Sequence, residues 1–318
     1  MLKIDRVTKV YRVGTFGRKK LHAVDNVSFT VNEGEVVSLI GESGSGKTTI
    51  GKMILHLIPI TSGLIIFKDF DISNLKGSAL RNYWQEVQGV FQDPFSSFNP
   101  IFKVDRTFGV IRREFFRKVN RHNWRDRVAV SLRAVGLDPD QVWNKFPHQL
   151  SGGQLQRLLI ARALLQDVRF LVADEITSMI DASTRVEILN LLAELKHRGL
   201  SVLFITHDLS LGYYISDRTV ILYKGRIVEK GLSDGIYFDP IHPYTRMLMD
   251  SLPRLDKKWG KAEIGLKAKQ AKLADGCVYY ERCPVLDKDW KCRDIRPDLR
   301  EVEPNHFVAC HYPMLQKR

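Results

Sequence analysis

The chain has 318 residues, of which 44% are hydrophobic and 27% are charged, as in an ordinary soluble globular protein. No apolar run approaches the ~20 residues that span a bilayer, and the start lacks the apolar region of a secretion signal. These features exclude a chain that crosses a membrane by itself and favour a cytosolic protein. The formal net charge of +13 identifies no partner, because Lys and Arg are spread along the chain without the interleaved aromatics of a nucleic-acid platform.

The first informative stretch joins a short apolar run, residues 35–40, to a helix-like segment through "GESGSGKTT". The spacing G-x-x-x-x-G-K-T predicts a loop whose backbone N–H groups surround phosphate oxygens. Lys47 is expected to reach the terminal phosphates, and Thr48 to offer a hydroxyl to Mg²⁺. A glycine turn without nucleotide is disfavoured by the strand–loop–helix context. The residues expected to contact the nucleotide here are Gly41, Ser43, Gly44, Ser45, Gly46, Lys47, Thr48 and Thr49.

Polar residues also follow three further apolar segments. Gln92, in "GVFQDP", is either a surface amide or a ligand to Mg²⁺ and the attacking water. Asp174 and Glu175 end "VRFLVADE", where Asp174 can hold Mg²⁺ and Glu175 can orient and polarise the water, unless both simply face solvent. His207 follows "SVLFIT" and could sense the terminal phosphate, although a lone His is more often structural. All lie at the carboxyl ends of predicted strands, where open α/β sheets bind ligands.

The stretch "LSGGQLQR", residues 150–157, opens a helix-like segment with small residues but no following lysine. Ser151, Gly152 and Gly153 offer a hydroxyl and unobstructed N–H groups at a helix start, which suits a terminal phosphate. This stretch, with Gln154, is therefore expected to complete a phosphate site built elsewhere.

These motifs, in this order and with Asp181, resemble the ATP-binding cassette of ABC transporters. The resemblance implies an α/β P-loop NTPase fold with a mixed β-sheet core and a helical subdomain at about 94–165. It implies a nucleotide-binding domain at 1–255 and a C-terminal extension at 256–318. It also implies two cassettes arranged head to tail, with ATP between the phosphate loop of one chain and the LSGGQ of the other. Tyr11 matches the aromatic residue that stacks on adenine in this family, although a lone tyrosine could equally be a half-buried strand residue.

Within that family, "GVFQDPFSSFNP", "FPHQLSGGQLQR" and "DPIHPYTRMLMDSLPRLD" resemble the dipeptide and oligopeptide importers, and the start of the chain resembles their F-type ATPase more than the D-type. The resemblance implies a peripheral subunit at the cytoplasmic side of the cell membrane. Its implied partners are a second cassette ATPase in a heterodimer, two integral membrane permease subunits and, through them, an extracytoplasmic substrate-binding protein. The helical subdomain would dock a cytoplasmic helix of a membrane subunit.

One segment departs from the family pattern. Residues 176–181 are "ITSMID" where Pro-Thr-Ser-Ala-Leu-Asp is usual. Ile176, Met179 and Ile180 replace smaller or more rigid residues, which can alter the path of the loop toward the partner. Because Lys47, Glu175 and His207 are all present, a competent catalytic site is still expected.

All four cysteines follow a Lys-rich stretch at 256–275, with the spacing C-x5-C-x8-C-x17-C. In a cytosolic protein such a set favours a metal site over disulfides. Four thiolates suit zinc or an iron–sulfur cluster, and four buried, reduced thiols are the plain alternative. The importer resemblance favours a four-iron, four-sulfur cluster that staples the tail, held by Cys277, Cys283, Cys292 and Cys310.

The sequence thus predicts an ATPase subunit that powers import of oligopeptides or dipeptides. Oligosaccharides or nickel are alternative cargoes, because specificity lies in other subunits. A cassette ATPase acting on nucleic acid or ribosomes is the alternative of another class; its only support is the net charge, and no nucleic-acid partner is expected. A subunit with an inactive site is disfavoured by Glu175 and His207.

Overall fold

The structure is a computed structural model that describes residues 1–14, 19–252, 276–285 and 289–314. A four-stranded antiparallel sheet has the order β2 (Lys19–Val31), β1 (Leu2–Val13), β4 (Ser62–Phe67) and β5 (Phe70–Asp71). An eight-stranded mixed sheet has the order β11 (Arg300–Glu303), β12 (His306–Val308), β10 (Arg226–Leu232), β9 (Arg218–Tyr223), β3 (Val36–Ile40), β8 (Ser201–Thr206), β7 (Phe170–Asp174) and β6 (Val87–Val90). The strands from β9 to β6 are parallel. The expected mixed sheet is confirmed.

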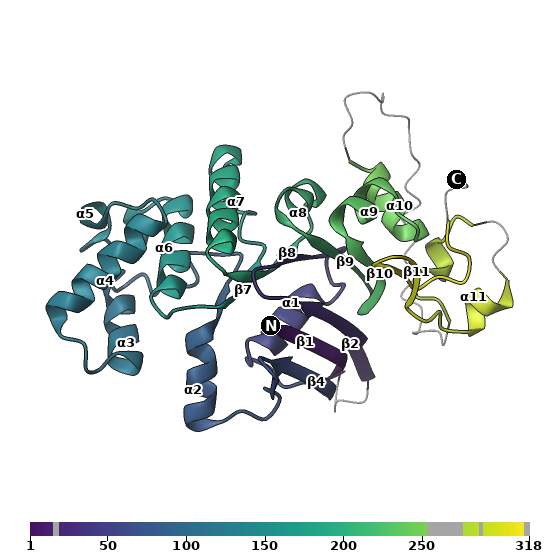
Figure 1. The fold of residues 1–318 in the computed structure, drawn as a ribbon, viewed down its shortest axis with the longest axis horizontal. Coiled ribbons are helices and arrows are strands. Elements are labelled where there is room, and N and C mark those ends of the chain that lie inside the picture. The colour runs from purple at the N-terminus through teal and green to yellow at the C-terminus, as the bar shows by residue number, and fades with distance from the viewer. Residues whose placement is uncertain (15–18, 253–275, 286–288, 315–318) are drawn as a thin grey trace.

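The α-helices of the first half are α1 (Lys47–Ile54), α2 (Gly77–Glu86), α3 (Asp105–Phe115), α4 (Arg121–Ala134), α5 (Pro139–Val142) and α6 (Gly152–Leu164). Those of the second half are α7 (Ala182–His197), α8 (Leu209–Ile215), α9 (Ser233–Phe238), α10 (Pro243–Asp250) and α11 (Trp290–Asp294). Two short 3-10 helices are η2 (Pro147–Gln149) and η3 (Tyr280–Arg282). Helices such as α7 and α8 cover the large sheet on one side, and the small sheet lies with α1 and α2 on the other (Figure 1).

The central strands are apolar because both faces of the sheet are covered. Every residue of β3, β7 and β8 is buried, as expected for parallel strands between two layers. One apolar core joins these strands to α1 and the small sheet, and another joins them to α3, α4, α6 and α7. The edge formed by the carboxyl ends of these strands is therefore rigidly positioned.

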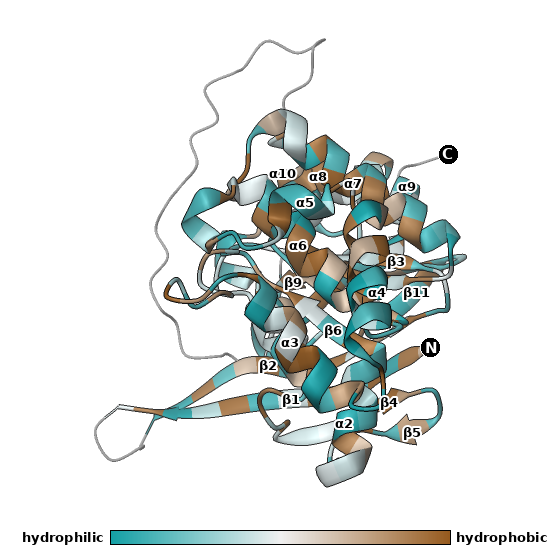
Figure 2. Ribbon diagram, turned by 90° about the vertical axis from the view of Figure 1, so that its left-hand side faces the viewer, coloured by the Kyte–Doolittle hydropathy of each residue, from teal (hydrophilic) through white to brown (hydrophobic). Residues whose placement is uncertain are grey.

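The interval predicted as a helical subdomain contains α3 to α6, which lie together at one end of the molecule (Figure 1). Trp124, Val128 and Leu132 of α4 are buried and belong to the same apolar core as Leu155 and Leu159 of α6. In Figure 2, which views that end, β1 and β2 project beyond the helices as a long antiparallel arm. The division of the chain into domains stays a prediction.

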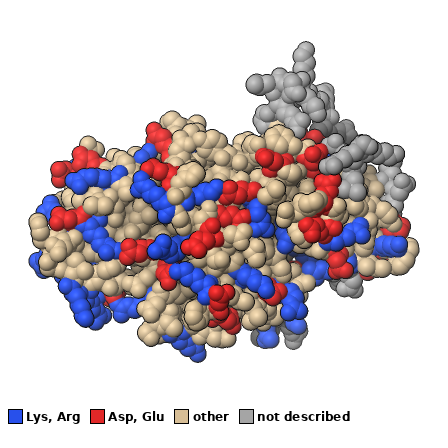
Figure 3. Space-filling model, in the orientation of Figure 1, with Lys and Arg blue, Asp and Glu red and all other residues tan. Residues whose placement is uncertain are grey.

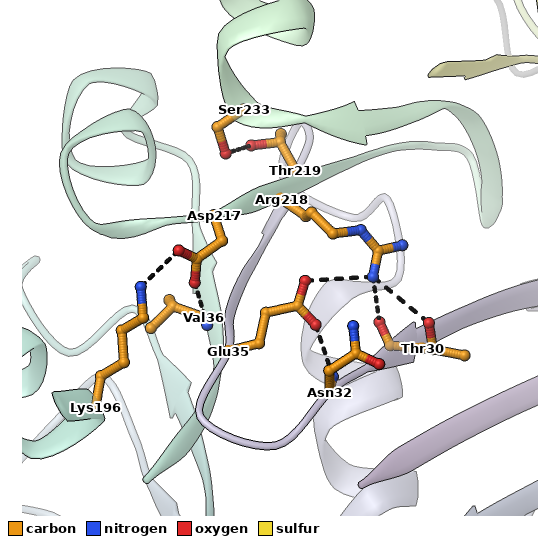
Figure 4. Close-up of polar contacts among 9 residues, drawn as sticks. All are labelled: Thr30, Asn32, Glu35, Val36, Lys196, Asp217, Arg218, Thr219 and Ser233. Atoms are coloured by element: carbon orange, nitrogen blue, oxygen red, sulfur yellow. Dashed lines mark hydrogen bonds and ion pairs between the residues drawn. The ribbon is translucent and has the colours of Figure 1, made fainter. Parts of the chain in front are cut away.

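A polar network holds the amino end of β3, opposite the glycine loop (Figure 4). The Asp217 carboxylate accepts a hydrogen bond from the Val36 N–H (2.9 Å) and pairs with the Lys196 ammonium (2.5 Å). The Glu35 carboxylate accepts from the Asn32 N–H and lies 3.3 Å from the Arg218 guanidinium. These bonds satisfy buried polar groups and fix the register of the strand that leads into the loop.

The C-terminal extension joins the large sheet, since β12 pairs with β10. Beneath that pair, the fully buried Glu229 carboxylate accepts hydrogen bonds from the N–H groups of Ile241 and His242 and lies 2.7 Å from the His306 ring. The Lys-rich stretch at 256–275, with the predicted boundary at 255/256, lies outside the described residues. No helix in the part of the chain that the structure describes is long and apolar enough to span a bilayer.

Candidate functional site

The glycine loop connects β3 to α1 in a shape that side chains would prevent. Gly44 and Gly46 have φ of +78° and +106°, a region that favours glycine. A Cβ on Gly46 would lie 2.4 Å from the carbonyl oxygen of Ala23, and one on Gly41 would lie 2.1 Å from that of Leu222. The loop is thus fitted between β2 and β9, and the first N–H groups of α1 face an anion site.

Lys47 lies inside this loop, with only 5% of its surface exposed. Its Nζ donates hydrogen bonds to the carbonyl oxygens of Gly41 (2.7 Å) and Glu42 (3.0 Å). Burial lowers the pKa of Lys47, while the carboxylates of Glu175 and Asp174 act in the opposite direction. The Ser45 hydroxyl is buried without a hydrogen-bond partner among the described residues. The loop therefore offers a cation and an unsatisfied hydroxyl, which fit phosphate oxygens.

The structure brings the two predicted acids to this loop. Asp174 ends β7, is 5% exposed, and its Oδ1 lies 3.3 Å from the Thr48 hydroxyl. Burial raises the pKa of Asp174, and the hydrogen bond from Thr48 opposes that shift. The solvent-facing alternative for Asp174 is therefore wrong. Thr48 and Asp174 form an oxygen pair of the kind that holds Mg²⁺.

Glu175 follows Asp174 in a conformation that is rare for a residue with a side chain. Its φ is +51°, and its N–H donates to the Ile205 carbonyl oxygen at 2.9 Å. Its Oε1 lies 3.2 Å from Nδ1 of His207, whose side chain is 61% exposed. Such backbone strain is often found at functional sites. The arrangement turns one carboxylate and one imidazole toward the same open edge.

Two predicted residues have less distinctive surroundings. Gln92 follows β6 and is exposed. Tyr11 is half-buried on β1, pairs with Leu21 of β2, and has the Lys9 ammonium 5.1 Å from its ring centroid. Their roles as magnesium ligand and adenine platform stay predictions.

The LSGGQ stretch begins α6 as expected. The Ser151 hydroxyl accepts from the Gln154 N–H (3.2 Å), and the Gln154 side chain accepts from the Ser151 N–H (2.9 Å), which is a capping box. A Cβ on Gly153 would lie 2.6 Å from the Thr184 methyl. Figure 1 places α6 among the helices at one end and α1 beneath the central strands. Ser151, Gly152, Gly153 and Gln154 therefore begin a helix of the helical layer, whereas the glycine loop of the same chain joins β3 to α1.

The segment with unusual residues packs beside this helix start. Ile176 and Ile180 are buried in the apolar core of the helical layer, while Met179 is 57% exposed. Asp181 caps α7 by accepting hydrogen bonds from the Ser183 hydroxyl and from the N–H and hydroxyl of Thr184, and these bonds hold its pKa well below the usual value. Ile176 and Ile180 therefore contribute to core packing, whereas Met179 does not, and the nucleotide role of Asp181 stays a prediction.

The four cysteines come together in the C-terminal extension. All four, with His242 and His311, line one enclosed cavity of about 20 Å³, and none forms a disulfide. Burial raises the pKa of Cys277, and that of Cys310 to about 12. The described ranges contain no group of three or more His, Cys, Asp or Glu side chains arranged to hold a metal ion. The donor set has the chemistry for a cluster, but the cavity is only about the size of one water molecule.

Sequence reasoning missed one contact of the glycine loop. The Glu42 carboxylate lies 2.9 Å from the guanidinium of Arg282, which is 240 positions away in the cysteine-containing extension. No local pattern signals this pair, because it exists only once the extension folds back onto the loop.

Comparison with known proteins agrees with this geometry. Residues 24–178 match the "ABC transporter" family model, and residues 228–292 match "Oligopeptide/dipeptide transporter, C-terminal region". The chain is 42% identical over 297 residues to a putative peptide import ATP-binding protein of Brucella ovis, covering 91% of this chain and 92% of that one. It is 40% identical over 325 residues to the oligopeptide transport ATP-binding protein AppF of Bacillus subtilis, covering 98% and 97%. A solved dimeric ATP-binding cassette, MJ0796 bound to ADP and Pi, has a TM-score of 0.66 and 29% identity, covering 73% of this chain and 99% of that one.

Replacing Glu175 by Gln should reduce ATP hydrolysis about 100-fold or more, because the amide cannot accept a proton from the attacking water. ATP binding should persist, since Lys47 and the loop are untouched. Phosphate release and nucleotide binding measure the two effects. Glu33→Gln, an exposed change at the opposite end of β3, is the matched control. Undiminished phosphate release by Glu175→Gln would disprove the catalytic role.

Proposed function

The chain belongs to the ABC transporter family and is an ATPase of that family, and we propose that it powers an importer of oligopeptides or dipeptides. The observation that carries the ATPase function is the convergence of Lys47, Thr48, Asp174, Glu175 and His207 at one edge of the sheet. The peptide cargo is supported by the C-terminal family match and by the relatives, which are named as peptide and oligopeptide transport proteins.

In the proposed reaction, the loop N–H groups, the Ser45 hydroxyl and Lys47 bind the phosphates of ATP. The Lys47 ammonium exchanges loop carbonyl oxygens for phosphate oxygens. Thr48 and Asp174, with Gln92, would hold Mg²⁺, which when bound offsets the negative charge of the phosphates. Glu175 orients the attacking water and accepts its proton, and His207 holds Glu175 and contacts the terminal phosphate. Tyr11 is proposed to stack on the adenine.

The ATP site is proposed to be completed by a second chain. Ser151 and the glycines beside it begin α6 in the helical layer, while the glycine loop joins β3 to α1, and their hydroxyl and N–H groups suit a phosphate. A dimeric arrangement is supported by the similar solved cassette MJ0796, which is a dimer bound to ADP and Pi. We propose that the partner is a different cassette ATPase and that this chain is the F-type subunit, because the similarity to AppF spans nearly its whole length.

An apolar groove supports docking to membrane subunits. A cavity of about 430 Å³ lies between α2, β6 and α3, and its lining includes Leu57, Trp84, Phe91, Val110 and Phe115. Leu57 and Val110 are 54% and 41% exposed, which is costly in water unless a partner covers them. We propose that a cytoplasmic helix of a permease subunit binds this groove. Such binding would hold the chain at the cytoplasmic face of the membrane. The permeases would in turn connect it to a substrate-binding protein.

The competing functions have less support. Oligosaccharide or nickel import shares the ATPase chemistry, but the relatives' names point to peptides. In Figure 3 the Lys and Arg side chains are dispersed over the visible face and mixed with acids. That pattern favours a solvated basic surface over a nucleic-acid platform, so action on nucleic acid or ribosomes rests only on the net charge.

The four thiols are proposed to hold a four-iron, four-sulfur cluster, with zinc as the alternative. Cys277, Cys283, Cys292 and Cys310 share one enclosed cavity, and thiolates are the usual ligands of both. A cluster needs more room than the small cavity provides, so the surrounding loops must move apart to accept it. When bound, the cluster would cross-link the C-terminal extension, which is short and has little apolar core of its own.

Affinity purification of the tagged chain from gently solubilised membranes of its own cell should recover a second cassette ATPase and two integral membrane proteins. Val110→Asp should abolish recovery of the membrane proteins, because it places a charge in the apolar groove. Val130→Asp, at an exposed position on α4 outside the groove, should not. Mass spectrometry identifies the chains.

Ribosomal proteins or nucleic acid in place of membrane subunits would contradict the transport function. Equal loss of the membrane proteins with Val110→Asp and with Val130→Asp would contradict the assignment of the groove as the docking site. Screening the associated binding protein with peptides and oligosaccharides decides the cargo.

Anaerobic purification should yield about four iron atoms per chain and a visible absorption band that is lost in Cys292→Ser. Elemental analysis distinguishes the alternatives, because one zinc per chain would replace the cluster assignment with a zinc site. Neither metal in stoichiometric amount would disprove the metal site and leave four reduced thiols.

A further inference from the structure

We propose that Arg282 of the C-terminal extension positions the ATP-binding loop by clamping Glu42. The carboxylate of Glu42 accepts hydrogen bonds from Nη1 of Arg282 at 3.0 and 2.9 Å. Glu42 is a variable position of the loop pattern, so phosphate binding by the loop does not itself require a carboxylate there. The inference rests on ATP binding by this loop and concerns its regulation by the extension.

The backbone of Glu42 is held from the same side. Its N–H donates to the Tyr244 hydroxyl at 3.1 Å, and the Tyr244 side chain is fully buried in α10. The ring of Tyr244 lies 4.6 Å from that of Tyr223 and 5.3 Å from that of Tyr279. An aromatic cluster drawn from the sheet, α10 and the extension therefore fixes the peptide that follows Gly41.

Arg282 is itself restrained by this cluster. Its guanidinium carbon lies 5.8 Å from the ring centroid of Tyr223 and 5.9 Å from that of Tyr279. Its Nη1 also lies 3.5 Å from the Tyr223 hydroxyl. A planar cation that lies near two aromatic rings loses less freedom on pairing than a free surface arginine. The pair therefore contributes more than an ordinary exposed ion pair.

The pair of Arg282 and Glu42 is connected to the phosphate site through Lys47. The Glu42 carbonyl oxygen accepts a hydrogen bond from the Lys47 ammonium at 3.0 Å. The position of the Glu42 peptide thus influences the group that must contact the terminal phosphates. Arg282 also neutralises a carboxylate that would otherwise repel ATP from the same loop. Both effects predict that loss of Arg282 weakens ATP binding without changing the catalytic groups.

The test measures binding of a fluorescent ATP analogue to the full-length chain and ATP hydrolysis by the assembled complex. Arg282→Gln should weaken binding about 2- to 5-fold and raise KM, with kcat at saturating ATP unchanged because Glu175 and His207 do not contact Arg282. Arg282→Lys should recover part of the affinity by restoring the charge. Arg293→Gln is the matched control, since Arg293 pairs with Asp294 on the exposed surface of the extension.

A double-mutant cycle separates the clamp from a general effect on folding. Adding Glu42→Gln to Arg282→Gln should cause no further loss and should recover part of the affinity, because the unpaired carboxylate is removed. The proposed clamp is disproved if Arg282→Gln binds ATP as tightly as Arg293→Gln. It is also disproved if the losses of ATP affinity caused by Arg282→Gln and Glu42→Gln simply add in the double variant. If Arg282→Gln does not fold, Arg282→Lys and Glu42→Gln complete the test, and wild-type affinity in both would overturn the clamp. A wild-type chain that binds no ATP would instead contradict the proposed function.

Discussion

The close fit of one glycine loop between a strand of the small sheet and a strand of the large sheet is the constraint on which the rest of the site depends. Gly46 lies against the backbone of β2 and Gly41 against that of β9, with no room for a Cβ at either position. The loop must therefore keep one path, which points the N–H groups of α1 and the Lys47 ammonium toward the same space. The buried strands β8 and β7, which follow β3 in the sheet order, then deliver His207 and Asp174 to that edge. Rigidity of this kind lets a few side chains act on a phosphate without costly rearrangement.

The same rigidity leaves the site open on one side. The strongest phosphate-binding candidate outside the loop is the start of α6, which stands with the helical layer and not beside α1. In the proposed head-to-tail dimer, each chain would supply the glycine loop of one site and the start of α6 of the other. The apolar groove between α2 and α3 lies in the same helical region. Movement of that region on ATP binding would therefore be transmitted to whatever helix occupies the groove.

Much of this could be predicted from the sequence because the informative features are local. The apolar run at 201–206 is β8, and the lysine and glycine spacing at 41–48 predicts a loop that the structure contains. The capping box at Ser151 follows equally from neighbouring residues. Contacts between distant segments could not be predicted: the pairing of Glu42 with Arg282 and the burial of Glu229 beneath His306 depend on how the extension folds back. The cavity shared by the four thiols required the same long-range information.

ATP is proposed to bind at the glycine loop of one chain, in a site that Ser151 of a second chain completes. Substituting Ser151 by Arg tests this proposal when nucleotide affinity of the isolated chain and hydrolysis by the assembled complex are measured on the same variant. The account predicts unchanged affinity in the isolated chain and reduced hydrolysis by the complex, because the bulky cation blocks only the partner's site. A parallel loss of affinity in the isolated chain would place Ser151 in its own chain's site, and unchanged hydrolysis would remove it from any site; either result contradicts the account.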